Sequence, residues 1–576
     1  MALAGCPGGD DSGSSGQSVP PEPEPAGNIR LNQLGFYPDS KKIAVVTGGS
    51  ANTFSVLSAD ALGERFSGTL SDSRQWAYSN ENVRLADFSA LTSPGRYRVR
   101  VEGFEDSPVF EITDGVYGDL AKASIKAFYY NRSGTALDAQ HAGQWARAMG
   151  HPDTDVRVHA SAASPPDRPE GKSISSPEGW YDAGDYNKYI VNSGISTYTL
   201  LAAYEHFSDY YNDLELNIPE SGNNLPDILD EALWNIRWML TMQDPGDGGV
   251  YHKLTTQNFA GFVMPDQATA TRYVVQKSTS AALNFATVMA VANRVLAAFD
   301  GELPPDFAED CLAAAVEAWN WAVDNPSVAY LQPPDIHTGA YAFGGDTFAD
   351  EFAWAAAELY LATSDPNYYD AFIDYRSAAN VPSWGFVDAL PWVSLAFHID
   401  RVPSAEQAGI NASILAVANE LLDSYTASAY GTAMGVTAGD FVWGSNSIAL
   451  NQGLMLIQAY RINGSPSYLE AAQANLDYIL GRNATGYSFV TGYGDVSPQN
   501  IHHRQSAADG IAVPVPGFVV GGPQSGQQDG CDGYPSNLPA RSYIDNVCSY
   551  STNEVTINWN APLVYLSGAL ESLSRP

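Results

Sequence analysis

The sequence predicts a multidomain chain, in which a small β-sandwich precedes a much larger all-helical domain. Two patterns along the 576 residues support this prediction. Between Ile29 and residue 113, short alternating apolar runs follow one another with turn residues between them, which is typical of a small sandwich. From Tyr117 onwards, apolar residues recur every three or four positions, and this spacing indicates helices.

The strands expected in the sandwich are short. They cover residues 42–46, 53–57, 83–85, 96–101 and 108–112. The region shows neither a carboxylate pair nor a row of aromatic residues, so we expect it to pack against and support the next domain. The predicted boundaries are 1–27 for a start segment and linker, 28–113 for the sandwich and 114–576 for the helical domain.

About twelve helices are expected in the helical domain. Their approximate ranges are 117–130, 187–207, 224–242, 278–299, 305–324, 349–362, 366–378, 388–397, 404–426, 445–462, 466–480 and 560–573. Three intervening loops, at 132–186, 243–277 and 481–559, are too long for simple connections. Loops of that length are usually functional.

Composition narrows the classes of function. The chain has 29 basic and 65 acidic residues, and its net charge of -36 argues against nucleic acid or an anionic membrane as a partner. Aromatic residues make up 11% of the chain, and they serve the core, a ligand cleft or both. No run of about 18 apolar residues is present, so we expect no transmembrane helix.

The chain contains four cysteines. Cys311 heads an apolar helical run and is expected to be a buried thiol. Cys531 and Cys548 bracket a loop, and two interpretations stay open for them, a disulfide in an oxidising compartment or two free thiols.

The first six residues, Met-Ala-Leu-Ala-Gly-Cys, resemble a trimmed bacterial lipoprotein processing site, in which Cys6 would carry the lipid. A chance match in so short a run is the alternative. Residues 7–27 are mostly Gly, Ser, Pro, Glu and Asp, and this composition predicts a disordered tether.

The stretch 179–189, Gly-Trp-Tyr-Asp-Ala-Gly-Asp-Tyr-Asn-Lys-Tyr, carries two carboxylates three residues apart. The small residues between Asp182 and Asp185 permit a tight turn that aims both acids into one cavity. Aromatic rings beside carboxylates suit a sugar, whose C–H faces stack on the rings and whose hydroxyls donate hydrogen bonds to the carboxylates. The alternative is a turn that opens a helix with Asp185 as its N-cap.

A single glutamate, Glu554, stands among apolar, aromatic and amide residues in the stretch 543–561, just before a final apolar helix. An acid in such surroundings is expected to have a raised pKa and to act as a proton donor near neutral pH. A proton donor and a separate carboxylate base are what the hydrolysis of a glycosidic bond requires. The alternative role for Glu554 is a structural glutamate at a helix start.

These two stretches, together with Ser-Phe-Val-Thr-Gly-Tyr-Gly at 488–494 and Ile-His-His-Arg at 501–504, resemble the signatures of glycoside hydrolase family 9, a family made up mostly of cellulases. The resemblance covers nearly the whole chain after the linker. One loop position departs from it, because Val496 stands where the family usually has a polar or basic residue. The resemblance implies an immunoglobulin-like module followed by an (α/α)6 barrel. Residues 29–36 resemble the opening of that module.

The resemblance also implies an inverting mechanism. Asp185 would be the general base that deprotonates a water, Asp182 would orient that water, and Glu554 would be the general acid. Inversion predicts that the base and acid carboxyl groups stand about 6.5–9.5 Å apart, with room for the water.

Substrate-binding residues are expected in the same signatures and in nearby loops. We expect His502 and Arg504 to bond sugar hydroxyls. Asp545 and Tyr550 belong to the signature of Glu554, and Asp545 would bond a sugar hydroxyl or an arginine, or serve only the loop structure. Three tryptophans could form aromatic platforms or belong to the core; they are Trp384, Trp443 and Trp559.

Two metal questions follow from the resemblance. One acidic group resembles a calcium site of related domains, and its members are Asp346, Thr347, Asp350, Glu351 and Asp388. The alternative is a helix N-terminus that favours acidic residues. Some relatives hold zinc with Cys and His, but the corresponding region here has three histidines and no Cys, so no zinc is expected; the histidines are His141, His151 and His159.

The sequence thus predicts an inverting, endo-acting β-1,4-glucan hydrolase, a cellulase, that is exported, tethered to a bacterial envelope or extracellular, and monomeric. Two alternatives remain. One is an exo-acting enzyme on cello-oligosaccharides or glucosamine oligomers, and the other is a non-catalytic carbohydrate-binding lipoprotein. The intact acids Asp182, Asp185 and Glu554 argue against the second alternative.

Overall fold

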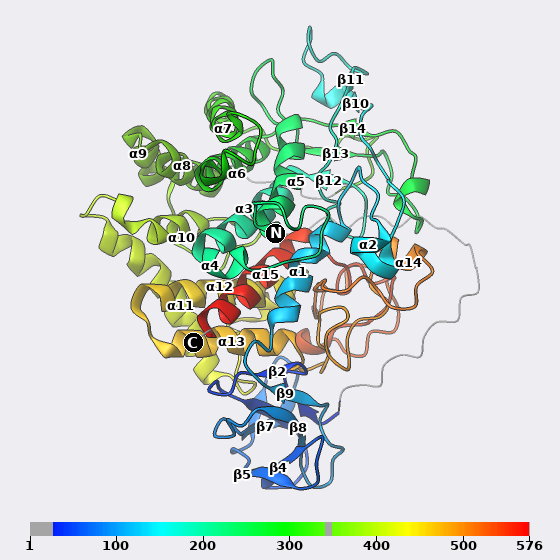
Figure 1. Cartoon of the computed structure of the whole chain (residues 1–576), viewed down its shortest axis with the longest axis vertical. Coiled ribbons are helices and arrows are strands. Elements are labelled where there is room, and N and C mark those ends of the chain that lie inside the picture. The colour runs from blue at the N-terminus through cyan, green and yellow to red at the C-terminus, as the bar shows by residue number, and fades with distance from the viewer. Residues whose placement is uncertain (1–26, 340–347, 575–576) are drawn as a thin grey trace.

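A computed structural model describes residues 27–339 and 348–574. It has a β-rich N-terminal domain, at the bottom of Figure 1, and a larger helical domain above it. The start segment with Cys6, and the acidic loop positions Asp346 and Thr347, lie outside the described residues.

The N-terminal domain consists of two sheets. The first has the strand order β1 (Ile29–Arg30), β3 (Ile43–Thr47), β7 (Glu81–Asp87) and β6 (Arg74–Trp76). The second has the order β2 (Gly35–Phe36), β9 (Phe110–Ile112), β8 (Gly95–Arg100), β4 (Thr53–Ser58) and β5 (Glu64–Thr69). Alternate residues of both sheets, such as Val46 and Val56, point into one shared core, as expected for a sandwich.

Among the described residues, the helical domain contains twelve helices of eight or more residues. They are α1 (Gly118–Tyr130), α3 (Ile190–His206), α5 (Asp227–Thr241), α6 (Thr279–Leu296), α7 (Phe307–Asp324), α8 (Ala349–Thr363), α9 (Pro366–Tyr375), α10 (Leu390–Phe397), α11 (Gln407–Ala427), α12 (Ser445–Asn463), α13 (Pro466–Ile479) and α15 (Ile557–Ser574). Each coincides with one of the helices predicted from the spacing of apolar residues.

Buried and half-exposed helices alternate along the chain. Helices α3, α6, α12 and α15 are buried on nearly every side, and helices that are apolar all round belong in a core. Helix α7 instead buries a single stripe that includes Cys311, Ala315 and Trp319. Contacts pass from α3 to α6, α8, α10, α11, α12 and α15, and α15 packs again on α3. These helices therefore form a closed circuit of contacts, and α15 lies near the centre of the view in Figure 1.

The loops predicted before α3 and α6 also contain a small sheet. Its strand order is β11 (Ser173–Ile174), β10 (Val156–Val158), β14 (Tyr273–Val274), β13 (Lys253–Thr255) and β12 (Lys188–Tyr189). This sheet joins segments about a hundred residues apart and lies at the upper right of Figure 1. Because β12 directly precedes α3, the sheet holds the start of that helix.

Hydrogen bonds tie the sandwich to the helical domain. The Asn32 side chain donates to the Asp477 carboxylate over 2.8 Å, and the Tyr37 hydroxyl donates to Glu571 over 2.7 Å. The Gln33 side chain donates to the Gly486 carbonyl and accepts from the Val496 N–H, each over 2.8 Å. The sandwich therefore braces the loop that contains the signature at 488–494.

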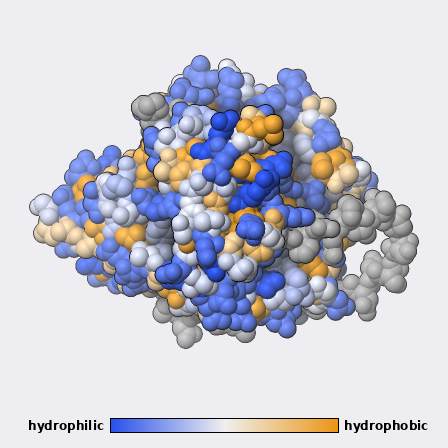
Figure 2. All heavy atoms as spheres, turned by 90° about the horizontal axis from the view of Figure 1, so that it is seen from below, coloured by the Kyte–Doolittle hydropathy of each residue, from blue (hydrophilic) through white to orange (hydrophobic). Residues whose placement is uncertain are grey.

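The surface seen from below is mainly polar, with small scattered apolar patches (Figure 2). One segment of the described chain, Thr279–Phe299, is long and apolar enough to cross a membrane. It includes α6, and 72% of its most apolar window is buried inside the fold, as in the core helix of a globular domain.

Candidate active site

Asp182 and Asp185 lie in a tight turn directly before α3. The Asp182 N–H donates to the Asn187 carbonyl over 3.0 Å and closes the turn. Both aspartates are largely buried, with exposed fractions of 2% and 5%. The N-cap of α3 is Tyr189, so the alternative in which Asp185 caps this helix is wrong, and its carboxylate is available for other contacts.

Three donors converge on one oxygen of Asp185. The Asn187 side-chain amide reaches Oδ2 over 2.6 Å, the Tyr189 hydroxyl over 3.1 Å and the Asn187 N–H over 3.3 Å. Among the described residues, no hydrogen bond reaches Oδ1. Donors on one oxygen fix the carboxylate in orientation, while the other oxygen remains an acceptor for water.

Asp182 is held from the side of α3 and α15. The Asn192 side chain donates to Asp182 Oδ1, and it also donates to the Thr556 hydroxyl over 3.1 Å. The Asp182 carbonyl accepts from the Ile557 N–H over 2.9 Å, at the first residue of α15. The turn with the aspartates and the segment with Glu554 are thus joined through backbone and side chains.

Glu554 lies three residues before α15 and is partly exposed. Its Oε1 atom accepts from the Gly184 N–H over 3.3 Å, which places the carboxyl group beside the turn of the two aspartates. Burial of the carboxyl group raises the pKa of Glu554 well above its usual value, and the nearby charge of Asp185 raises it further. The two acids therefore differ. The raised pKa of Glu554 favours its protonated form, whereas hydrogen-bond donors surround Asp185.

His502 and Arg504 also lie beside Gly184. The His502 backbone forms a parallel bridge with Glu554, and its ring nitrogen Nδ1 lies 2.6 Å from the Val547 carbonyl. Burial lowers the pKa of His502 to about 4, so the ring is neutral near pH 7 and donates through Nδ1 to that carbonyl. Its Nε2 is then an acceptor, which suits a sugar hydroxyl.

Arg504 is mostly engaged with backbone. Its guanidinium donates to the Gly184 carbonyl over 2.8 Å and to the Ala260 carbonyl over 2.7 Å. Arg504 therefore pins the aspartate turn to a neighbouring loop. The contact between Arg504 and a sugar hydroxyl stays a prediction.

Asp545 organises the loop that leads to Glu554. Its two carboxylate oxygens accept from the N–H groups of Gln499 and Asn500, over 2.8 and 2.9 Å, and the Asn553 side chain adds a third bond over 3.0 Å. These contacts match the loop-structure interpretation for Asp545. Its bond to a sugar hydroxyl stays a prediction.

A row of aromatic rings crosses the site. The Trp443 ring lies 5.7 Å from Tyr550, Tyr550 lies 5.7 Å from His502, and His502 lies 5.3 Å from Phe262, all between ring centroids. Trp443 is partly exposed at the start of α12. Phe262 is not among the site residues predicted from the sequence, although it stands in the long loop 243–277, whose length indicates a functional role.

The other two tryptophans differ in exposure. Trp559 is 7% exposed, and its indole packs closely over Gly444 and Gly521, so it belongs to the core beside the site. Trp384 is partly exposed and packs on the helical core. Its role as a platform stays a prediction.

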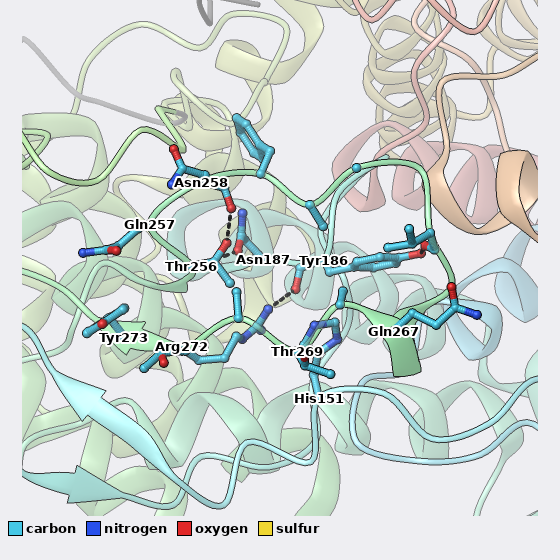
Figure 3. Close-up of a pocket in the computed structure, with 17 residues that line it drawn as sticks. His151, Tyr186, Asn187, Thr256, Gln257, Asn258, Gln267, Thr269, Arg272 and Tyr273 are labelled. Carbon is cyan, nitrogen blue, oxygen red and sulfur yellow. Dashed lines mark hydrogen bonds between the residues drawn. The ribbon is translucent and has the colours of Figure 1, made fainter. Parts of the chain in front are cut away.

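Asn187 also lines a cavity of about 370 Å³ next to the aspartate turn. Figure 3 shows Asn187, Tyr186, His151 and Arg272 around this cavity, with the Arg272 guanidinium aimed at the Tyr186 carbonyl. The Asn187 side-chain oxygen accepts from the Thr256 N–H over 3.1 Å. Asn187 thus links Asp185 to the cavity wall.

Within the described residues, no group of three His, Cys, Asp or Glu side chains is arranged to hold a metal ion. Asp350 accepts from the Val387 N–H, and Asp388 accepts from the Asn380 side chain and backbone. Burial raises the pKa of Glu351 well above its usual value, and the adjacent Asp350 adds to the rise. The described acids of the expected calcium group are therefore partly occupied by the chain itself.

The three histidines named for zinc have protein neighbours. His151 Nδ1 lies 2.9 Å from the Tyr181 hydroxyl, and His159 lies beside Ser161 and Asp335. His141 is near Asn217. These contacts give each ring a partner in the fold.

Cys531 and Cys548 are joined in a disulfide, with their Cα atoms 5.5 Å apart. This answers the question that the sequence left open. The bond closes the loop that leads into the Asp545 and Glu554 segment. Cys311 is a free, buried thiol as predicted, and burial raises its pKa to about 12.

A carboxyl group with a raised pKa, next to a carboxylate held by donors, is the arrangement of an acid–base hydrolase on glycosidic bonds. Comparison with known proteins agrees with this class. The family model described as Glycosyl hydrolase family 9 matches residues 117–567, and the model described as Cellulase N-terminal ig-like domain matches residues 24–106. The chain therefore belongs to glycosyl hydrolase family 9, and it is a glycoside hydrolase.

Individual relatives cover nearly the whole chain. The "Xyloglucan-specific endo-beta-1,4-glucanase BoGH9A" of Bacteroides ovatus is 46% identical over 561 residues, which cover 95% of this chain and 94% of that protein. "Endoglucanase D" of Acetivibrio thermocellus is 32% identical, over 95% and 84%. The structure titled "Bacteroides ovatus GH9" superposes with a TM-score of 0.89 at 43% identity, covering 95% of this chain and 99% of that one.

Proposed function

We propose that this chain is an inverting, endo-acting β-1,4-glucan hydrolase in which Asp185 is the general base, Asp182 orients the water and Glu554 is the general acid. The relatives named as endo-acting β-1,4-glucanases support the reaction and the substrate class. The observation that carries the residue roles is the contrast between the two carboxyl groups. Glu554 has a raised pKa, whereas three donors surround Asp185 Oδ2.

In the proposed reaction, a water bound between Asp185 Oδ1 and Asp182 attacks the anomeric carbon. Asp185 takes one proton from the water, and the C–O bond to the leaving sugar breaks. Glu554 gives its proton to the leaving oxygen, so no alkoxide forms. A β-linked substrate therefore releases its new reducing end first as the α-anomer.

The experiment that tests these roles follows the anomer of the first product by ¹H NMR. We expect the α-anomer from the wild type, and we expect Asp185→Asn and Glu554→Gln to lose at least about a thousandfold in kcat. Asp495→Asn, at an exposed carboxylate in a neighbouring loop, is the matched control and should keep full activity. A β-anomer as the first product, or an active Glu554→Gln variant, would contradict the mechanism.

The relative that is named for xyloglucan makes this branched glucan the first polymer to test. The time course of products from cellohexaose separates endo action from the exo alternative. A spread of intermediate lengths from the start supports endo cleavage, and removal of one unit at a time from one end contradicts it. The "Cellodextrinase" of Butyrivibrio fibrisolvens, 34% identical over 94% of this chain and 100% of that protein, makes this comparison necessary.

The closed circuit of helices supports an (α/α)6 barrel, in which an inner ring of buried helices would lie inside an outer ring of half-exposed helices. We also propose an exported monomer that Cys6 could tether to the cell envelope. Radiolabelled fatty acid incorporated into the wild type but not into Cys6→Ser would support the anchor, and equal labelling of both would contradict it.

Calcium remains a proposal for the acidic group at Asp350, Glu351 and Asp388. A bound Ca²⁺ would allow Glu351 to ionise despite its burial. We expect a chelator to lower the melting temperature of the wild type, and added Ca²⁺ to restore it. Asp388→Asn should remove this dependence. A melting temperature that does not respond to the chelator would contradict the proposal.

A further inference from the structure

Phe262 is a large aromatic side chain that stays exposed beside the catalytic centre. Its exposed fraction is 46%, although most large apolar side chains of the helical domain are buried. The ring lies nearly perpendicular to that of His502, with centroids 5.3 Å apart, and the Arg504 guanidinium lies 5.7 Å from the ring centroid. Nearly half of the side chain is therefore left for contact with a ligand.

The backbone around Phe262 presents the ring at the tip of a turn. The Val263 N–H donates to the Gly261 carbonyl over 2.9 Å, which is the i to i+2 bond of a γ-turn with Phe262 at its centre. Both shoulders of the turn are anchored. Arg504 donates to the Ala260 carbonyl over 2.7 Å, and the Tyr186 hydroxyl donates to the Val263 carbonyl over 2.6 Å.

These anchors come from the catalytic machinery itself. Tyr186 follows the base Asp185 in sequence, and Arg504 also bonds the Gly184 carbonyl in the turn between the aspartates. Figure 3 shows the loop between Asn258 and Gln267 passing over Tyr186. Phe262 is therefore positioned before substrate arrives, and an exposed ring that is fixed in this way loses little conformational freedom on binding.

The position of Phe262 relative to Glu554 places the ring close to the bond that is cleaved. Phe262 contacts His502, and the His502 backbone is bridged to Glu554. A Cβ atom built on Gly184 would lie 3.0 Å both from Glu554 Oε1 and from the His502 ring carbon Cδ2, so these two side chains approach the turn together. Glu554 would protonate the oxygen of the bond that is cleaved, so a ring beside Glu554 lies next to one of the two sugars that this bond joins.

We propose that Phe262 is the aromatic platform for the glucosyl unit on the leaving-group side of the bond that is cleaved. The C–H face of that sugar stacks on the open face of the ring. The acceptor nitrogen of His502 lies at the edge of the platform and receives a sugar hydroxyl. This inference rests on the proposed function, because it assumes that Glu554 is the acid and that the substrate is a β-1,4-glucan.

The test compares two substrates that differ only on the leaving-group side. Cellohexaose places glucosyl units there, whereas β-cellotriosyl fluoride releases fluoride and leaves the platform empty. We expect Phe262→Ala to lower kcat/KM on cellohexaose about tenfold, the factor that corresponds to one lost aromatic stack. On the fluoride, kcat/KM should stay within about twofold of the wild type.

Two further variants complete the test. Phe262→Tyr keeps the ring and should restore most of the activity on cellohexaose, which a variant with a merely disturbed fold would not allow. Phe66→Ala, at an aromatic residue on β5 of the sandwich, is the control and should leave both substrates unaffected. An equal loss on both substrates, or no loss on either, would overturn the platform assignment.

The outcome for the wild type separates this inference from the function on which it rests. A wild-type enzyme that hydrolyses neither substrate contradicts the proposed function. A wild-type enzyme active on both, with Phe262→Ala indistinguishable from it, contradicts only the role of Phe262.

Discussion

The backbone N–H of Gly184 donates a hydrogen bond to Glu554 Oε1 over 3.3 Å, so the turn that carries both aspartates also holds the glutamate. His502 and Glu554 both approach this glycine closely. A Cβ atom at position 184 would lie 2.2 Å from the His502 carbonyl oxygen and 3.0 Å from Glu554 Oε1. Distances of this kind between the base turn and the acid leave no room for a side chain.

Gly184→Ala should therefore lower kcat by about a hundredfold, because the acid and base must move apart to admit the methyl group. We expect KM to change much less, since the substrate-binding loops remain. Gly409→Ala is the matched control, because a Cβ there meets nothing within 4 Å. Steady-state kinetics of both variants check the prediction, and full activity of Gly184→Ala would show that the carboxyl groups tolerate the shift.

The raised pKa of Glu554 predicts how stability depends on pH. A carboxyl group whose folded-state pKa is raised stabilises the fold at pH values below its unfolded pKa, and that contribution is lost as pH rises through the folded pKa. Glutamine cannot ionise, so Glu554→Gln does not lose this contribution as pH rises. We therefore expect the variant to melt at a higher temperature than the wild type at pH 8, and at nearly the same temperature at pH 4.

The raised pKa of Glu554 also predicts how activity falls at alkaline pH. Glu554 must carry its proton to act as an acid, so kcat/KM should fall as pH rises through its raised pKa. Thermal unfolding and initial rates, measured from pH 4 to pH 8, test the stability prediction and the activity prediction together. A wild type that gains stability over Glu554→Gln as pH rises would contradict the assignment of burial as the cause.

Asn187 is expected to position the base without touching substrate. Its side chain donates to Asp185 Oδ2 over 2.6 Å and accepts from the Thr256 N–H over 3.1 Å. Asn187→Ala should lower kcat about tenfold to a hundredfold and leave KM nearly unchanged, because the carboxylate loses its fixed orientation. Asn258→Ala, at an exposed position on the adjacent loop, is the control. A change confined to KM would contradict a positioning role.

The sequence predicted the helices well because their signal is local. Apolar residues at three- and four-residue spacing mark a buried face, as along α7, and burial on all sides produces the nearly continuous apolar run of α6. The small sheet of β10 to β14 escaped prediction because its strands are only two or three residues long. Such strands are stabilised by partners far along the chain, and no local pattern reveals them.

The candidate site shows the same contrast between features with a local sequence signal and features that only the fold brings together. The acids could be named from their neighbours in sequence, since small residues around Asp185 and apolar ones around Glu554 imply a turn and a raised pKa. Their supporting residues could not, because Asn192 and Phe262 reach the site from separate segments, and only the fold brings them there.

The buried bond between the two domains predicts a stability effect. The Asn32 side chain donates to Asp477 over 2.8 Å and to the Tyr117 hydroxyl over 3.0 Å. Asn32→Ala leaves the buried carboxylate without one of its donors, which costs about 1–3 kcal/mol of unfolding free energy. Asn52→Ala, at an exposed residue of the sandwich, should cost much less. Urea unfolding measures both, and equal values would contradict a supporting role for this contact.

The disulfide should stabilise the segment that leads to the acid. Cys531 and Cys548 are 17 residues apart, and closing a loop of this size contributes up to about 3 kcal/mol by the chain-entropy model. The closed loop includes Val547, whose carbonyl faces the His502 ring nitrogen over 2.6 Å. Freeing the loop should therefore loosen His502 as well as lower stability.

The double variant Cys531→Ser, Cys548→Ser should melt at a lower temperature than the wild type and show a raised KM for cello-oligosaccharides, because His502 is no longer held in place. Reduction of the wild type with dithiothreitol should reproduce both changes, whereas the double variant should not respond to the reductant. Cys311→Ser controls for the loss of a thiol elsewhere. A double variant with unchanged KM but lower stability would limit the bond to a structural role, and this would separate the loop from substrate binding.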